Sequence, residues 1–199
     1  MKWTIALLAL LTSLTSFALE SGKQAPDFKL AGAGTKDGEM SLSQFKGKIV
    51  VLEWLNHGCP FVRKHYDSGN MQALQKKYVG QNVIWLSIIS SAPGKQGHVD
   101  AAGAREDVVK NKSGATTVLL DPAGSVGKLY EAKTTPHMYI IDKDGKLAYQ
   151  GAIDDKPDTE QSSIAGAKNY VAEALDLIIA GKPVSAHTTK AYGCGVKYQ

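Results

Sequence analysis

Two apolar runs without polar alternation dominate the first half of the chain. The first covers residues 49–55, and the second covers residues 82–89. Unbroken runs rich in β-branched and aromatic residues predict strands that are buried on both faces of a sheet. Between them, Pro60 suits the first position of a helix, and apolar residues extend that predicted helix to Tyr78. The order strand, helix, strand predicts a parallel pair joined by a crossover.

The rest of the chain continues with shorter elements after a short extended lead-in at 25–30. Helices are predicted at 100–111, 124–130 and 164–180, and strands at 116–120, 137–142 and 146–150. Asp144-Gly145 separates the last two strands and is typical of a tight hairpin turn. Gly181 and Pro183 close the last helix. The predicted class is α/β, with a central mixed β-sheet flanked by helices and preceded by an N-terminal extension.

The N-terminal residues 1–18 differ from the rest in composition. Lys2 precedes an apolar run, and the small residues that end at Ala18 suit a cleavage site. This pattern predicts a secretory signal peptide, since the apolar run is short for a membrane span; the alternative is an uncleaved anchor. We expect a periplasmic or secreted mature chain without membrane insertion, with one domain at 19–184 and a tail at 185–199.

Length and charge narrow the class of protein. The chain has 199 residues, of which 43% are hydrophobic, and this suits one domain with a proper core. Its formal charge of +4 is spread along the chain rather than clustered. A spread charge gives little support for a nucleic-acid surface, and we expect no nucleic-acid partner.

Cys59 is the strongest candidate for chemistry. It directly follows the loop after the first buried strand and opens the predicted helix. The free N–H groups and the positive end of a helix dipole stabilise a thiolate at such a position. Arg63, one turn later, and His57, two residues before, also favour a lowered thiol pKa. The alternative is that Cys59 is a small buried hydrophobic residue.

Three segments together carry a resemblance to a known family. They are residues 45–54, the Cys59-Pro60 segment through Val62, and residues 134–142 with Thr135-Pro136. Over about residues 22–180 the chain resembles the thioredoxin-like superfamily, in its alkyl hydroperoxide reductase/thiol-specific antioxidant (peroxiredoxin-like) branch. The resemblance implies a thioredoxin-like fold in which Thr135-Pro136 forms a cis-proline loop that faces Cys59.

The chain also departs from the patterns of its relatives. Thioredoxins carry Cys-x-x-Cys, but the second of these positions is Val62. Peroxiredoxins place their cysteine after Pro-x-x-x-Thr/Ser-x-x, and here Leu52 and Asn56 occupy those two places. The chain therefore resembles peroxiredoxin-like proteins that keep only the first thioredoxin cysteine. This pattern argues against the usual peroxiredoxin geometry.

Glu53 interrupts an otherwise apolar strand. A carboxyl group is seldom buried in such a strand without a role. Six residues before Cys59, it matches the position at which thioredoxins hold a buried carboxylate that relays protons. Burial would raise its pKa and suit it to acid–base work. The alternative is an acid near the strand end that reaches water or pairs with a lysine.

Cys194 lies between two glycines in a C-terminal tail of little periodicity. The segment resembles the Gly-Cys-x-Ile/Val-Lys-aromatic ending of peroxiredoxin-like relatives, which implies that the tail brings a second thiol to the first. A Cys59–Cys194 bridge would then serve thiol–disulfide exchange. A permanent structural disulfide and a pair of free thiols are the alternatives.

The five histidines offer a weaker signal. If the resemblance holds, His57 and His137 would approach Cys59, and cysteine with histidine could bind copper or zinc. No local ligand spacing supports this, so polar loop histidines are the favoured interpretation, with no metal and no cofactor. His65, His98 and His187 are predicted to be ordinary surface residues.

The leading hypothesis is an exported thiol-disulfide oxidoreductase or antioxidant that acts through a reachable Cys59 thiolate. Its expected partners are a protein disulfide or a peroxide, and a thiol electron donor. Cys194 would resolve the intermediate and Glu53 would relay a proton. The expected substrate-binding residues are Thr135, Pro136, Pro60, Arg63 and His57. The alternatives are a non-catalytic thioredoxin-fold binding protein with a structural Cys59–Cys194 disulfide, and a copper or zinc carrier.

Overall fold

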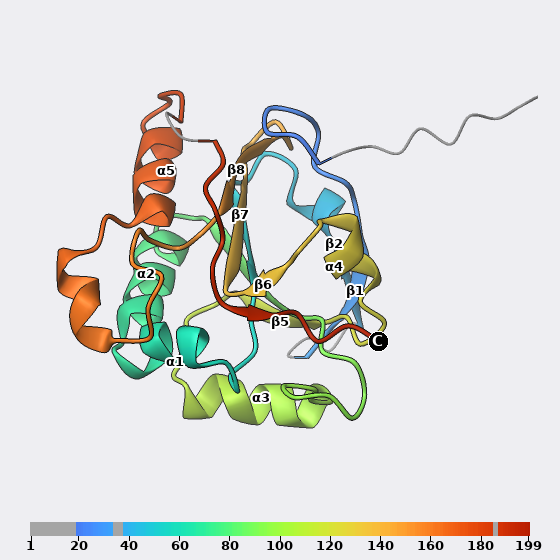
Figure 1. Ribbon diagram of the computed structural model, residues 1–199. Helices are drawn as coiled ribbons and strands as arrows, with labels where there is room; N and C mark the ends of the chain where they lie inside the picture. The colour runs from blue at the N-terminus through green and yellow to red at the C-terminus, as the bar shows by residue number, and fades with distance from the viewer. Residues whose placement is uncertain (1–18, 34–37, 185–186) are drawn as a thin grey trace, which may run out of the picture.

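A seven-stranded mixed sheet forms the centre of the protein. The computed structural model describes residues 19–33, 38–184 and 187–199, so the expected signal peptide at 1–18 lies outside the described residues (Figure 1). The strand order is β2-β1-β5-β4-β3-β7-β8. These strands are β1 Lys29–Gly32, β2 Glu39–Ser41, β3 Val50–Trp54, β4 Ile84–Ile89, β5 Thr117–Leu120, β7 His137–Ile141 and β8 Leu147–Gly151.

The two apolar runs lie side by side in the middle of this sheet. β3 pairs parallel with β4, and β4 pairs parallel with β5, whereas β7 runs antiparallel to β3. All five residues of β3 are buried. The predicted parallel pair is confirmed, and so is the hairpin between β7 and β8. A central strand with neighbours on both sides and cover on both faces is expected to be mainly apolar, and β3 is apolar at every position except Glu53.

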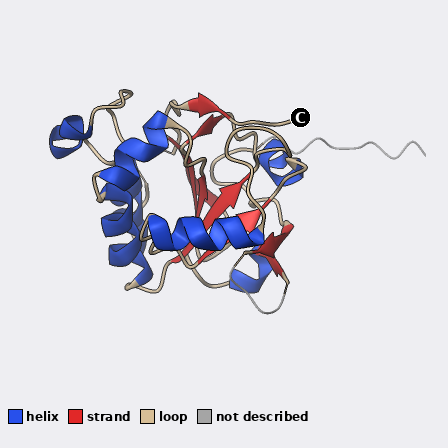
Figure 2. Ribbon diagram, turned by 90° about the horizontal axis from the view of Figure 1, so that it is seen from below, coloured by secondary structure: helices blue, strands red, loops and turns tan. Residues whose placement is uncertain are grey.

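Helices cover both faces of the sheet. They are α1 Pro60–Asp67, α2 Asn70–Val79, α3 Ala101–Lys110, α4 Ser125–Leu129 and α5 Tyr170–Ile179, with 3-10 turns at Leu42–Phe45 and Gln161–Gly166. Val51 of β3 packs in a core cluster with residues of α1, α2 and α5, whereas Leu52 packs in a second cluster with α4. Successive side chains of a strand point to opposite faces, which separates the two clusters. Viewed from below, the strands lie between the helices (Figure 2).

Two predicted helices differ from the structure. The single helix expected from Pro60 to Tyr78 is divided into α1 and α2, because Gly69 adopts a left-handed conformation at φ 79°. Glycine tolerates this conformation without the steric cost that a side chain adds. The helix expected at 164–180 begins later, at Tyr170, where the Asn169 side chain caps it by accepting a hydrogen bond from the Ala172 amide.

The C-terminal tail returns across the molecule and adds a small second sheet. Its strand β9, Cys194–Gly195, pairs antiparallel with β6, Thr134–Thr135, in a register that places Cys194 opposite Thr135. In Figure 1 the tail passes beside β8 and then runs alongside β6. The structure also holds no helix, among the residues it describes, that has the length and apolar character to cross a bilayer.

Candidate active site

Cys59 stands where strand β3 gives way to helix α1. It is the N-cap residue of α1, and Pro60 follows at the first helical position. The preceding loop is held by Asn56, whose carbonyl oxygen accepts a hydrogen bond from the Cys59 amide at 2.9 Å. The Asn56 side chain also accepts from the amide of Gly58 at 2.8 Å. The backbone therefore fixes the thiol at the amino end of the helix, as the sequence predicts.

The thiol of Cys59 lies under the proline loop and the tail. Its Sγ donates a hydrogen bond to the carbonyl oxygen of Thr135 at 3.1 Å. The Thr135–Pro136 peptide bond is cis, and Cys194 pairs with Thr135 on the other side of β6. Cys59 has 0% exposed surface, so the expectation of a reachable thiol is wrong for this conformation. The physical reason is that β9 occupies the edge of β6 beside the thiol.

Several hydrogen bonds bias Cys59 towards its thiolate form. Burial alone raises the pKa of the thiol, but hydrogen bonds from the Cys194 side chain and from the backbone of Val62 and Cys194 bring the pKa below its ordinary value. The Val62 amide belongs to the first turn of α1, where amides have no helical partner. The Thr135 hydroxyl, a buried group with no other hydrogen-bond partner in the part of the chain that the structure describes, also contributes to lowering this pKa.

Cys194 has the opposite tendency. Burial, a hydrogen bond with Cys59 and the charge of Cys59 raise the pKa of Cys194 to about 11, against a smaller opposing effect of Lys197. Both cysteines are free thiols in the structure. Of the two thiols in this contact, Cys59 is therefore the one that ionises first as pH rises.

Glu53 is completely buried on the face of the sheet that α1 and α2 cover. Four neutral donors hold its carboxyl group, namely Tyr66 at 3.0 Å, Gln75 at 3.2 Å, Trp85 at 2.8 Å and Ser87 at 2.9 Å. Burial raises the pKa of Glu53, and these hydrogen bonds oppose the rise. The alternative of an acid that reaches water or pairs with a lysine is wrong. Cys59 is not among its hydrogen-bond partners.

The other residues expected around the thiol have different surroundings. The His57 ring is half-buried and packs edge-on against Tyr66, with 4.9 Å between ring centroids. Pro60 is exposed at the start of α1. Arg63 points into solvent with its side chain 64% exposed and pairs with Asp67 at 3.2 Å. The guanidinium is thus engaged along its own helix, because residues four apart share a helix face.

The histidines do not assemble a metal site. His137 packs on Tyr139, and its Nδ1 lies 3.0 Å from the hydroxyl of that tyrosine. Tyr139 belongs to the second core cluster, whereas Cys59 belongs to the first. Throughout residues 19–33, 38–184 and 187–199, no three His, Cys, Asp or Glu side chains form a group that could hold a metal ion.

Sequence reasoning missed a buried polar cluster behind the tail. His98 and His187 are exposed as predicted, but His65 is completely buried, so its assignment to the surface is wrong. Its partners Asp154 and Tyr192 come from a loop and from the tail. Residues 65, 154 and 192 carry no common motif, and only tertiary folding brings them together.

A thiolate-favouring cysteine at a strand–helix junction, facing a cis-proline loop, defines the class of protein. The chain is a thiol-dependent oxidoreductase with a thioredoxin-like fold. It belongs to the Redoxin family, whose profile matches residues 20–168.

Similar proteins agree with this assignment. A thiol-disulfide oxidoreductase ResA of Bacillus thuringiensis subsp. konkukian is 28% identical over 129 residues, which cover 65% of this chain and 68% of ResA. An uncharacterized conserved protein of Geobacillus kaustophilus is 26% identical with a TM-score of 0.75, covering 92% of this chain and 94% of that chain. A putative thiol:disulfide interchange protein DsbE of Chlorobium tepidum is 28% identical with a TM-score of 0.52, covering 67% of this chain and 85% of that chain.

Proposed function

We propose that this protein is an exported thiol-disulfide oxidoreductase in which Cys59 attacks and Cys194 resolves. The observation that carries the proposal is the contact between two free thiols whose pKa values shift in opposite directions. A nucleophile and a resolving group need this asymmetry, because only the ionised thiol attacks a disulfide. The names of ResA and DsbE favour a disulfide over a peroxide as the substrate.

The first step uses the thiolate of Cys59. It attacks one sulfur of the substrate disulfide, forms a mixed disulfide with it, and breaks the substrate S–S bond. The departing substrate sulfur leaves as a thiolate and takes up a proton. Donors from Val62 and Cys194 support the thiolate before the attack.

The second step uses the thiol of Cys194. Once Cys59 is part of a mixed disulfide, it no longer carries the charge that helps to raise the pKa of Cys194. The Cys194 thiol then loses its proton more readily and attacks Sγ of Cys59. The Cys59–Cys194 bond forms, the second substrate thiolate leaves, and a thiol electron donor later reduces the bridge. The substrate gains two electrons, and the two protein thiols lose them.

Substrate access requires the tail to shift, because Cys59 has no exposed surface. Strand β9 has only two residues, so moving it away breaks few backbone hydrogen bonds. We propose that the substrate then contacts Thr135 and Pro136, with Pro60 and His57 at the border of the site. Arg63, which is exposed, would meet the substrate only at the rim.

Glu53 is proposed to relay the proton. Burial raises the pKa of Glu53 and so favours its protonated form, which a carboxyl group needs in order to give a proton. The signal-peptide pattern supports export, and an oxidising compartment contains disulfide substrates. N-terminal sequencing of the exported protein should begin at Leu19.

Trapping of an intermediate tests the proposal. The Cys194→Ser variant should accumulate a mixed disulfide between Cys59 and a disulfide-bonded substrate protein, detected by mass spectrometry of the intact adduct. The Cys59→Ser variant should form no adduct under the same conditions. A Cys194→Ser protein that forms no adduct, although it is folded, would contradict the assignment of Cys59 as the nucleophile.

A further inference from the structure

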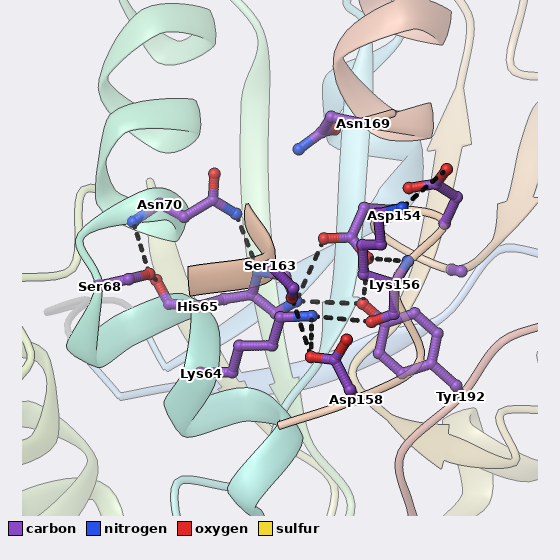
Figure 3. Close-up of polar contacts among 12 residues, drawn as sticks. Lys64, His65, Ser68, Asn70, Asp154, Lys156, Asp158, Ser163, Asn169 and Tyr192 are labelled. Carbon is purple, nitrogen blue, oxygen red and sulfur yellow. Dashed lines mark hydrogen bonds and ion pairs between the residues drawn. The ribbon is translucent and has the colours of Figure 1, made fainter. Parts of the chain in front are cut away.

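A buried polar cluster joins the tail, two residues before Cys194, to helix α1, whose N-cap residue is Cys59. It consists of His65 on α1, Asp154 in the loop after β8, and Tyr192 on the tail (Figure 3). The Tyr192 hydroxyl donates to Oδ1 of Asp154 at 2.5 Å and lies 3.3 Å from Nε2 of His65. Three separate segments therefore meet at one hydroxyl group.

The donors and acceptors of this cluster form one chain of hydrogen bonds that runs from Asn70 to Asp154. The Asn70 amide lies 2.8 Å from Nδ1 of His65 and donates to it, which leaves Nε2–H to donate to Tyr192. Tyr192 in turn donates to Asp154. A neutral imidazole fits this chain of bonds, and burial lowers the pKa of His65 to about 4.

The ring of Tyr192 is fixed as well as its hydroxyl. It packs against Phe61 with 5.8 Å between ring centroids, and the ammonium of Lys64 lies 5.8 Å from its centre. The Lys64 ammonium is itself buried and held by the Lys156 carbonyl at 2.8 Å and the Asp158 carboxyl at 3.2 Å. Both ends of Tyr192 are therefore set by groups on or beside α1, the helix that begins next to Cys59.

Gly193 connects Tyr192 to Cys194 and is itself tightly packed. A Cβ on Gly193 would lie 2.1 Å from the carbonyl oxygen of Thr135, so the backbone of the tail passes directly against β6. One residue later, Cys194 pairs with Thr135. With Tyr192 fixed and Gly193 packed on β6, little freedom remains for the Cys194 backbone.

A buried carboxyl group is a costly means of attaching a tail if attachment is all that is required. Oδ2 of Asp154 is buried without a hydrogen-bond partner among the described residues and lies 3.9 Å from Nε2 of His65. Buried polar contacts fix one geometry more strictly than an apolar contact does, because any displacement leaves polar atoms unpaired. This property suits a group whose position matters to a bond-forming step.

We propose that Tyr192, held by Asp154 and His65, is a positioning residue that fixes Cys194 for attack on Cys59. The proposal rests on the proposed function of Cys194 as the resolving thiol. Within the described part of the chain the cluster makes no hydrogen bond to either sulfur, and it acts through Gly193, the single residue between Tyr192 and Cys194.

The tail offers a matched control on the other side of Cys194. The Tyr198 hydroxyl donates to the carbonyl oxygen of Ala132 at 2.8 Å, and its ring lies against Gly124 and Gly127. Tyr198 thus attaches the tail through a neutral acceptor and a tight fit of its ring. Replacing either tyrosine by phenylalanine removes one hydroxyl group from the same segment.

Two-phase thiol release from dithiobis(nitrobenzoate), an aromatic disulfide, tests the proposal on the whole folded chain. Attack by Cys59 releases the first thionitrobenzoate, and resolution by Cys194 releases the second. We expect Tyr192→Phe and Asp154→Asn to slow the second phase about tenfold and to leave the first phase unchanged or faster. Tyr198→Phe should change the second phase much less.

The outcomes separate this proposal from the proposed function. A wild-type protein that releases no second thionitrobenzoate, or a Cys194→Ser protein that still releases it, would overturn the resolving role itself. A normal wild-type second phase that Tyr192→Phe and Asp154→Asn leave unchanged would overturn only the positioning role. Equal slowing by Tyr198→Phe, or loss of the folded state in both Tyr192→Phe and Asp154→Asn, would also overturn it.

Discussion

The two thiols of the site are held by different kinds of structure. Cys59 sits between a central strand and a helix, and backbone hydrogen bonds of the Asn56 loop and of α1 define its position. Cys194 sits on a tail whose regular structure is a two-residue strand. Side chains on either side of it, Tyr192 and Tyr198, attach that tail to the domain.

The two regions therefore have different roles in the proposed reaction. The region formed by β3, the Asn56 loop and α1, called here the Cys59 half, holds its thiol in a fixed environment. The ends of this strand and helix cannot move without loss of core packing. The tail around Cys194, called here the Cys194 half, covers the Cys59 thiol and must move away when a substrate binds. A segment attached by side chains and by isolated backbone hydrogen bonds, such as that from the Val196 amide to the Lys133 carbonyl, can open locally at a lower free energy than the sheet can.

The two cysteine-to-serine variants should show the largest difference in activity between the Cys59 half and the Cys194 half. Cys59→Ser should abolish disulfide reduction, because no other thiol lies at the amino end of α1. Cys194→Ser should retain the first phase of thiol release and lose the second. Stopped-flow absorbance with dithiobis(nitrobenzoate) measures both phases, and identical behaviour of the two variants would remove the distinction between attacking and resolving thiols.

Glu53→Gln probes the Cys59 half next. If the carboxyl group relays a proton, steady-state disulfide reduction should fall by about a hundredfold. Burial raises the pKa of Glu53, so the pH–rate profile of the wild type should have an inflection above the ordinary pKa of a carboxyl group. The profile of Glu53→Gln should lack this inflection.

Ser87→Ala is the matched control for this substitution. It keeps the carboxyl group and removes one hydrogen bond that lowers the pKa of Glu53, so the inflection should move to higher pH. Unfolding curves establish that both variants are folded. An unchanged pH–rate profile in folded Glu53→Gln would leave Glu53 with a structural role only.

Gly193→Ala disturbs the Cys194 half through the backbone. Its φ of 138° and its closeness to the Thr135 carbonyl leave no room for a methyl group. The substitution should lower the free energy of unfolding by about 1–3 kcal/mol and speed alkylation of Cys59 by loosening the tail. Gly195→Ala is the control, since none of the described residues lies within 4 Å of an added Cβ there. Equal effects of the two substitutions would contradict the close packing of the tail on β6.

The smallest expected effect is a pH dependence of stability from the tail cluster. Burial lowers the pKa of His65 from 6.5 to about 4, so the unfolded chain binds a proton more readily than the folded chain. His65 therefore contributes stability that is complete at neutral pH and is lost as pH falls from 6.5 towards 4. The loss from this residue should be about 1–2 kcal/mol between about pH 7 and pH 5.

Urea unfolding at several pH values measures this loss. His65→Gln should remove its share of the decline, so the stability of the variant should fall less steeply than that of the wild type. A variant with the same pH slope as the wild type would show that other groups, such as His137, cause the decline.

The sequence predicts the Cys59 half better than the Cys194 half, and the reason is the range of the interactions. Buried parallel strands are recognisable from local apolar runs, and Pro60 at a helix start is a local signal. Gly69 is a local signal for the break between α1 and α2, but a glycine in the middle of a helical pattern is often tolerated, so its presence alone does not predict a break. The resemblance to a family correctly implied the contact between Cys59 and the Thr135 loop.

The tail cluster has no such local signal. His65 lies on a helix whose amphipathic pattern does not identify it as buried, and its partners are 89 and 127 residues away in the chain, at Asp154 and Tyr192. Burial of Cys59 itself also depends on the tail. These features follow from tertiary packing of an aperiodic segment, and no propensity or spacing rule predicts such packing.

The pKa of Cys59 is the most direct test of the central claim. Thiolate absorbance, titrated in the wild type and in Cys194→Ala, should give a Cys59 pKa below the ordinary value of a cysteine thiol. Loss of the Cys194 hydrogen bond in the variant should raise that pKa. A wild-type pKa at or above the ordinary value, unchanged in Cys194→Ala, would contradict a thiolate stabilised by its partner thiol.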